Sequence, residues 1–139
     1  MAYIPLKAGK HQIKVILDMA VKFVRSKTMV RFDAGKVAVM RGPIVYCAES
    51  TDNIKPLWNY IIHYQNVIAT EVKFSKELGG IVKIKVPAYR RILDHHSDPL
   101  YINIAKQIKY QIKTLNMIPY YAWNNRGCVS MLVWFDSNI

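Results

Sequence analysis

Short apolar runs that alternate with lysine constrain the fold of this chain more than any other feature. The alternation has a period of two in Ile13, Val15 and Leu17, and again in residues 82–86, Val-Lys-Ile-Lys-Val. A period of two places successive side chains on opposite faces of a β-strand, so such segments predict strands with one buried side and one side in solvent. Segments 57–64 and 87–94 could each form a turn or two of helix, but neither shows several turns of helical periodicity. The pattern therefore predicts an all-β chain.

Turn signals separate the predicted strands, which favours a sandwich or barrel over alternating strands and helices. A bend or bulge is expected at Arg41-Gly42-Pro43, because Pro43 cannot donate a hydrogen bond to a sheet. Residues 52–66 and 88–99 are the best candidates for surface loops. Because 139 residues suit one domain, we expect a single antiparallel β-sandwich, jelly-roll-like, over residues 1–139. The predicted strands cover residues 11–17, 21–24, 36–40, 44–49, 67–74, 81–86, 106–115 and 129–135.

The charge is strongly positive, with 20 Lys and Arg against 9 Asp and Glu and a formal net charge of +11. Such a balance would suit an anionic partner such as nucleic acid. However, the lysines of residues 82–86 and 107–113 alternate with apolar residues, which places them on the solvent face of strands, where they discourage pairing between edges. The chain also lacks an RNA-binding aromatic-glycine signature and a basic helix. We therefore expect no nucleic-acid partner.

The apolar runs are too short for a membrane span, which needs about 18 residues. The first ten residues contain no apolar stretch long enough for the core of a signal peptide. These observations predict no membrane partner and a cytoplasmic location for the chain as written.

No arrangement in the sequence forms a self-contained active site. Two cysteines do not make a disulfide framework: Cys47 is expected to be a buried strand thiol, and Cys128 follows a turn and could be exposed. His95-His96-Ser97-Asp98 is interpreted as a turn, because adjacent histidines on an extended chain point to opposite faces and rarely bind one ion. The acidic residues occur singly, and neither a phosphate-binding glycine loop nor a Gly-x-Ser-x-Gly turn is present. We therefore assign no catalytic residue, no metal ligand and no cofactor.

An aromatic cluster in residues 118–127 is the best candidate for a binding surface. Three interpretations remain open. Alternate rings such as Tyr121 and Trp123 could fill the core, the cluster could contact another domain, or flat rings beside amides and a guanidinium could bind a sugar. The candidate residues for an interdomain or glycan contact are Tyr120, Tyr121, Trp123, Asn124 and Arg126.

Four segments of the chain together resemble glycoside hydrolase family 127, the β-L-arabinofuranosidase-like proteins. Residues 33–49 are similar to the family's Gly-Lys-Val-Ala…Arg-Gly-Pro-Leu-Val-Tyr-Cys…Glu segment, and residues 78–82 to its Leu-Gly-Gly-Val segment. Residues 118–127 resemble the Ile-Pro-Tyr-Tyr-Ala-Trp-x-Asn-Arg-Gly signature, and residues 131–134 the closing strand. Residues 10–19 fit the preceding strand more loosely. Order and spacing hold across nearly the whole chain.

The resemblance implies that the chain is the C-terminal β-sandwich of such a protein, a structural accessory domain that packs against a helical catalytic domain. Members hydrolyse terminal β-L-arabinofuranosyl sugars with a zinc-held cysteine nucleophile, and all of these residues lie before the matched region. Neither Cys47 nor Cys128 takes that role. The alternative is a carbohydrate-binding module that uses the aromatic cluster.

The family's sheet also contains a further short strand that is missing here. This absence predicts an exposed sheet edge, and unpaired edges favour strand addition between copies. A homodimer through that edge, or through a swapped N-terminus, is therefore a further expectation.

Overall fold

The computed structural model describes residues 3–63, 70–92, 99–103 and 108–138. Within these residues the regular structure is nine β-strands and a few single-turn 3-10 helices, with no α-helix. No helix in this part of the chain is long and apolar enough to cross a membrane. The strands are β1 (Val21–Arg25), β2 (Lys36–Arg41), β3 (Ile44–Glu49), β4 (Tyr60–His63), β5 (Glu71–Ser75), β6 (Ile81–Ile92), β7 (Lys109–Pro119), β8 (Met131–Leu132) and β9 (Phe135–Asn138).

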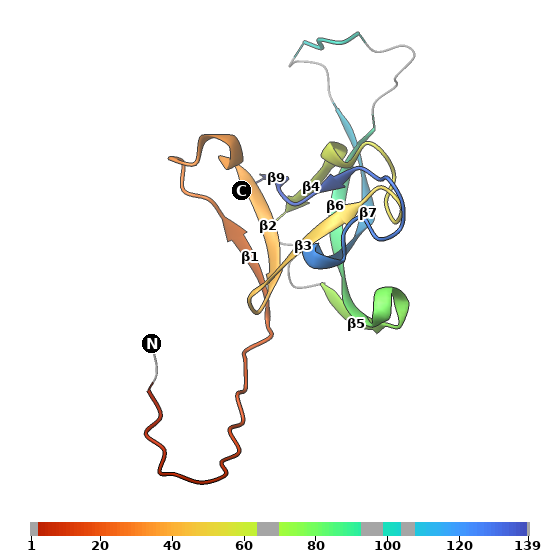
Figure 1. Cartoon of the computed structure of the whole chain (residues 1–139). Coiled ribbons are helices and arrows are strands. Elements are labelled where there is room, and N and C mark those ends of the chain that lie inside the picture. Colours follow the sequence, from red (N-terminus) through yellow and green to blue (C-terminus); the bar gives the residue numbers. More distant parts are fainter. Residues whose placement is uncertain (1–2, 64–69, 93–98, 104–107, 139) are drawn as a thin grey trace.

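Six of these strands pair side by side in a closed ring. The order is β2, β9, β4, β6, β7 and β3, and the ring closes where β3 pairs with β2 through Met40 and Val45. Neighbouring strands are antiparallel except β4 and β9, which are parallel. Three strands lie outside the ring, β1 on β2, β5 on β6 and β8 on β3. Figure 1 shows the ring strands gathered around one core.

The all-β class is thus confirmed, whereas the strands form a closed six-stranded barrel rather than a clear two-sheet sandwich. The reason lies in residues 52–66, which were predicted to be a surface loop. This segment contains the 3-10 turn Leu57–Asn59 and then β4, whose Tyr60, Ile61 and Ile62 are buried. Strand β4 occupies the position between β6 and β9 and so joins the two halves of the sheet. The parallel β4–β9 pair also departs from the wholly antiparallel arrangement that we expected.

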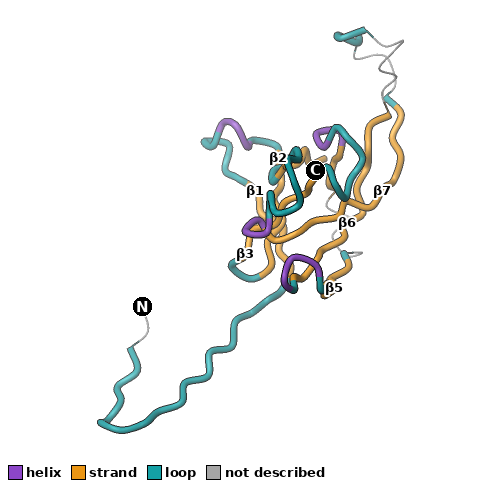
Figure 2. The backbone as a smooth tube through the Cα atoms, turned by 45° about the vertical axis from the view of Figure 1, so that its right-hand side comes forward, coloured by secondary structure: helices purple, strands orange, loops and turns teal. Residues whose placement is uncertain are grey.

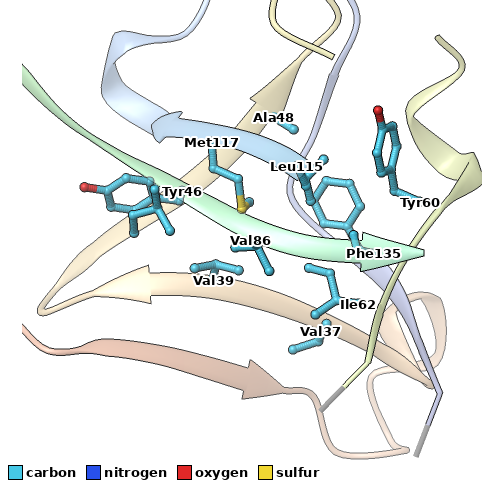
Figure 3. Packing of buried hydrophobic residues seen from close by; sticks show 12 residues of the cluster. Val37, Val39, Tyr46, Ala48, Tyr60, Ile62, Val86, Leu115, Met117 and Phe135 are labelled. Carbon is cyan, nitrogen blue, oxygen red and sulfur yellow. The ribbon is translucent and has the colours of Figure 1, made fainter. Parts of the chain in front are cut away.

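The barrel interior is filled by apolar side chains from all six ring strands. Val39, Tyr46, Val86, Met117 and Phe135 are fully buried and lie together between the ring strands (Figure 3). The alternation in β6 explains the arrangement, since Ile84, Val86 and Ala88 face inward while Lys83 and Lys85 face outward. The period of two therefore selects which side of each strand enters the core.

A second, smaller cluster lies on the outer face of the barrel. Cys47, Ile81 and Ile118 come from β3, β6 and β7, at positions that alternate with the core residues. Ala122 packs against them, together with Leu78, Met131 and Val133. This cluster fastens the loops around residues 78 and 122 to the outside of the barrel.

Strand β6 is longer than predicted, because residues 88–92 belong to it and not to a loop. It runs through Pro87, which cannot donate a hydrogen bond to a neighbouring strand. On one side β6 pairs with β5 up to Lys85 and with β4 from Tyr89 onward, so Pro87 lies in the gap between these two partners. The proline therefore interrupts no ladder on that side.

Most other predicted strands are found, with shifted ends, but the one strand predicted over residues 129–135 is two short strands, β8 and β9, which pair with different neighbours. The turn at Gly42 and Pro43 is a tight hairpin between β2 and β3, where a bend or bulge was expected. The parts of the predictions that fall on residues 64–69, 93–98 and 104–107 lie outside the described residues, and these include His95-His96-Ser97-Asp98.

The prediction of a strand over residues 11–17 is wrong for this structure. Residues 3–20 leave the barrel as an extended, solvent-exposed segment, here called the N-terminal arm (Figures 1 and 2). Its apolar alternation is typical of a strand, but no strand in the described part of the chain pairs with it. A strand needs a partner to bury one face, and the barrel is closed without this segment.

Candidate functional site

The aromatic loop, residues 120–127, begins where β7 ends at Pro119. Tyr120–Ala122 form one turn of 3-10 helix, closed by a hydrogen bond from the Trp123 N–H to the Tyr120 carbonyl (3.1 Å). The small side chain of Ala122 points inward and is buried in the outer cluster. The turn breaks the alternation of β7, so the bulky neighbours of Ala122 face away from the barrel.

All three aromatic rings of the loop are exposed to solvent. Tyr120 is 45% exposed, Tyr121 66% and Trp123 36%. The rings of Tyr120 and Trp123 stack, with centroids 6.0 Å apart and planes inclined by 27°. The interpretation that Tyr121 and Trp123 fill the core is therefore wrong, because Ala122 occupies the inward position. The contact surface and the sugar platform remain as interpretations.

Arg126 points inward, toward two carboxylates. Its Nη1 and Nη2 donate to the two carboxylate oxygens of Asp52 (3.0 and 2.7 Å), and its Nε donates to Glu49 Oε2 (3.1 Å). A further hydrogen bond joins Nη2 to the same Glu49 oxygen. The hydrogen bonds to Asp52 and then to Glu49 raise the pKa of Arg126 against the opposing effect of burial. A bidentate guanidinium pair of this kind has a fixed geometry as well as a large electrostatic gain.

The buried Glu49 also fixes the backbone of the loop. Its Oε1 accepts a hydrogen bond from the Asn124 N–H (3.0 Å), at a residue whose φ of +65° lies in the left-handed region. The side-chain amide of Asn125 donates to the carbonyls of Ala122 and Trp123 (3.1 and 3.3 Å). Arg126, Glu49 and Asp52 are here called the loop anchor, because together they hold the aromatic loop against β3.

The loop anchor itself rests on a second polar contact. Asn53 donates to the carbonyls of Glu49 and Asn116 (2.8 and 2.9 Å) and accepts the N–H of Asn116 (2.8 Å). The segment that carries Asp52 is thereby tied to β7. Glu77 adds a longer ion pair to Arg126 at 3.6 Å.

The structure thus brings two acidic residues together, which sequence reasoning did not foresee. Glycosidases use a pair of carboxylates on either side of the scissile bond. Glu49 is fully buried, and the Asp52 side chain is mostly covered. Both carboxylates are occupied by one guanidinium, so their arrangement stabilises the loop and leaves no room for a substrate between them. Glu49 lies in a segment that resembles family 127, but Asp52 lies in none, so no signal in the sequence suggested the pairing.

The two cysteines lie in unlike surroundings. Burial raises the pKa of the Cys47 thiol to about 12, and the nearby negative charge of Glu49 acts in the same direction. A nucleophilic or zinc-bound cysteine needs the opposite shift. Cys128 is exposed. Within residues 3–63, 70–92, 99–103 and 108–138, no three His, Cys, Asp or Glu side chains gather as a metal site would require.

A small pocket of about 200 Å³ is lined by residues of the paired strands β5 and β6 and by Glu77, which also forms the longer ion pair with Arg126. Lys73, Lys83 and Lys85 line it together with Phe74, Ser75 and Glu77. Lys83 forms an ion pair with Glu77 at 2.7 Å, which lowers the pKa of that carboxyl. The sequence pattern correctly placed Lys83 and Lys85 on the solvent face, and it made no prediction for Lys73.

Comparisons with known proteins agree with one another. A family model described as the glycoside hydrolase family 127 C-terminal domain matches residues 21–136. A non-reducing end β-L-arabinofuranosidase from Bifidobacterium longum subsp. longum is 43% identical in an alignment of 136 residues that covers 95% of this chain and 20% of that protein.

Solved structures give the same result. The crystal structure of a GH127 β-L-arabinofuranosidase from Geobacillus stearothermophilus T6 matches with a TM-score of 0.79 and 36% identity, over 86% of this chain and 18% of that one. A second structure, of a GH127 β-arabinofuranosidase, matches with a TM-score of 0.70 and 32% identity, over 87% of this chain and 18% of that one. The chain spans about a fifth of the length of these relatives.

Proposed function

The chain belongs to the glycoside hydrolase family 127 C-terminal domain family, and we propose that it acts as a non-catalytic accessory domain that packs against a helical catalytic domain. The parent family consists of glycoside hydrolases. On this proposal the catalytic groups, including the family's zinc and its cysteine nucleophile, belong to the other domain, and this chain contributes stability.

The observation that carries the proposal is that some groups of the aromatic loop bond within the domain while its rings stay exposed. Its charged and backbone groups are used internally, since Arg126 is held by Glu49 and Asp52 and the Asn124 N–H by Glu49. The rings of Tyr120, Tyr121 and Trp123 face outward, beside the exposed residues Asn124 and Asn125. Rigid aromatic side chains on a fastened loop are the residues that are enriched at the centres of protein interfaces.

A chimera tests the proposal. We would replace the matched region of the Bifidobacterium longum enzyme with the full 139-residue chain and compare thermal unfolding of the chimera with that of the isolated chain. The double variant Tyr121→Ser/Trp123→Ser should lower the Tm of the chimera by several degrees, because interface rings of this kind contribute about 2 kcal/mol each. The same variant should leave the isolated chain nearly unchanged, because its rings are already in water.

Phe32→Ser is the matched control, since Phe32 is another exposed aromatic residue, far from the loop in the sequence. This substitution should leave the Tm of both the isolated chain and the chimera unchanged. An equal loss of stability in the isolated chain and in the chimera would show that the rings stabilise the barrel itself. If the double variant Tyr121→Ser/Trp123→Ser lowers the stability of neither protein, the aromatic loop is not part of the interface.

The isolated chain is expected to release no chromophore from a chromogenic β-L-arabinofuranoside, with or without added zinc. Genuine turnover by the purified chain, retained after treatment with a chelator or restored by zinc, would refute the non-catalytic role.

A carbohydrate-binding module is the second candidate, and the exposed rings of Tyr120 and Trp123 favour it. Two observations weigh against it. The two rings stack on each other, which covers one face of each, and Arg126 is already occupied by carboxylates. Calorimetry with plant glycans separates the candidates, because a binding module would release heat that Trp123→Ser abolishes.

A further inference from the structure

The N-terminal arm exposes a strand-like apolar face. Ile13 is 54% exposed, Val15 74% and Leu17 60%. In a β-strand the alternation would place these three side chains on one face and Lys14 and Ile16 on the other. Fully burying an aliphatic side chain of this size contributes about 1.5–3 kcal/mol, so the arm leaves a considerable stabilisation unused.

The base of the arm is held at a defined place on the barrel. The Gly42 N–H donates to the Ala20 carbonyl (3.1 Å), and the Ala20 N–H donates to Asp18 Oδ1 (3.0 Å). Gly42 has a φ of +56°, and an added Cβ would lie 2.6 Å from the Met19 sulfur, so Met19 covers the hairpin turn closely. The arm therefore leaves the barrel from the β2–β3 turn in a fixed position.

The barrel offers the arm no place beside β2. At the point where the arm departs, β2 already pairs with β1 on one side and with β3 and β9 on the other. The outer edges of β1, β5 and β8 have no partner among the described strands, but the arm pairs with none of them, and Figures 1 and 2 both show it running away from the strands. Its partner is therefore expected outside the barrel.

The limits of the similarity to known proteins indicate which partner this is. The C-terminal domain model begins to match at residue 21, where β1 begins. The match to the Bifidobacterium longum enzyme covers 95% of the chain, so it leaves out at most about seven of the 139 residues and includes most of the arm. Most of the arm is thus shared with a much longer relative, although the match to the C-terminal domain model begins only after it.

We propose that residues 11–17 form a β-strand that adds to the edge of a sheet in the polypeptide preceding this domain in a full-length enzyme of the family. This inference rests on the proposed attachment to a larger hydrolase, but it concerns a different surface from the aromatic loop. Ile13, Val15 and Leu17 face the interior of that sheet's domain, and Lys14 and Ile16 face away from it. Main-chain hydrogen bonds give such strand addition its strength, and the apolar face fixes its register.

Hydrogen exchange of the arm is the direct test. In the chimera defined above, the backbone amides of residues 11–17 should exchange at least about 100-fold more slowly than in the isolated chain, because strand hydrogen bonds protect amides that are otherwise in water. Exchange at the same rate in the two proteins would overturn the inference. Protection that grows with the concentration of the isolated chain would also overturn it, because the partner would then be a second copy.

Two substitutions on opposite faces of the arm supply the second readout. Val15→Lys should lower the Tm of the chimera by several degrees and leave the isolated chain unchanged. Ile16→Lys introduces the same charge one residue away, on the other face, and should be tolerated in both. Equal effects of the two substitutions in the chimera would refute the assigned face.

The two proposals fail separately. If Tyr121→Ser/Trp123→Ser weakens the chimera while the arm amides stay unprotected, the accessory role stands and the strand addition is wrong. If the arm is protected while the aromatic variants have no effect, the aromatic loop is not the contact.

Discussion

The N-terminal arm and strand β6 have the same alternating sequence pattern, but their apolar side chains differ in burial. In β6, Ile84 and Val86 alternate with lysines and are fully buried. In the arm, Ile13 and Val15 alternate with polar residues and stay in solvent. Strand β6 has β7 along its length and β4 or β5 on its other side, whereas no described strand pairs with the arm. A period of two therefore shows that a segment can form a half-buried strand, and topology decides whether a partner is present.

The largest difference between barrel and arm should appear when one apolar side chain is removed from each. Phe135 is the first residue of β9, and Phe135→Ala deletes its fully buried ring. It should lower the free energy of unfolding by about 3–5 kcal/mol, since it removes burial and leaves a cavity. Ile16→Ala in the exposed arm should change it by less than about 0.5 kcal/mol. Urea unfolding of the isolated chain measures both, and similar losses would mean that the arm folds back onto the barrel in solution.

The loop anchor should give the next largest effect. Arg126→Met removes the cation between Glu49 and Asp52 and leaves a fully buried carboxylate without its partner. We expect the free energy of unfolding, measured in urea, to fall by about 3 kcal/mol, which is the lower end of the range found when one member of a buried ion pair is deleted.

The double variant Glu49→Gln/Arg126→Met is the control for the loop anchor. It should recover part of the loss, because a neutral amide can still accept the Asn124 N–H. Additive losses from the two single substitutions would contradict a direct coupling of the pair.

The class of fold could be predicted from the sequence because alternation is a local signal. Closure of the barrel could not be predicted from the sequence, because it requires β4 to pair with β9 and, elsewhere in the ring, β2 to pair with β3. The run Tyr60-Ile61-Ile62 was the missed signal. A continuous apolar run is consistent with a strand buried on both faces, and it was interpreted as part of a loop.

The candidate site was predictable in composition and not in orientation. The aromatic residues were identified, but the 3-10 turn that places Ala122 inward and the rings outward has no clear sequence signal. The partner of Arg126 was also hidden, because Glu49 precedes it by 77 residues. Pairing across such a distance is set by the fold and cannot be deduced from local spacing.

A smaller effect is expected where the arm joins the barrel. Gly42→Ala places a Cβ at a φ of +56°, against Met19, and should cost about 1–2 kcal/mol from the left-handed backbone plus the added contact. Gly35→Ala is the matched control, since Gly35 has a φ of +76° with nothing within 4 Å of the added atom. The excess cost of Gly42→Ala over Gly35→Ala measures how firmly Met19 is held. Equal costs would mean that the base of the arm moves freely.

The smallest effect concerns the charge at the base of the arm, and it depends on pH. The Ala20 N–H and then Lys22 hold the pKa of Asp18 below its ordinary value. A lowered pKa in the folded state stabilises the protein above the pKa of the unfolded state, and this contribution is lost as the pH falls through the folded value. Asp18→Asn should therefore be slightly less stable than the parent at pH 7, and the difference should disappear below about pH 4, where the unfolded-state carboxyl takes up its proton and the folded one follows. Added salt should also shrink it, because Asp18 and Lys22 are exposed. Thermal unfolding of both proteins across this range is the measurement, with Asp33→Asn, which alters an acidic residue outside the arm, as the control. A difference that grows as the pH falls would mean that Asp18 destabilises the folded state, and the arm would then have no anchored base.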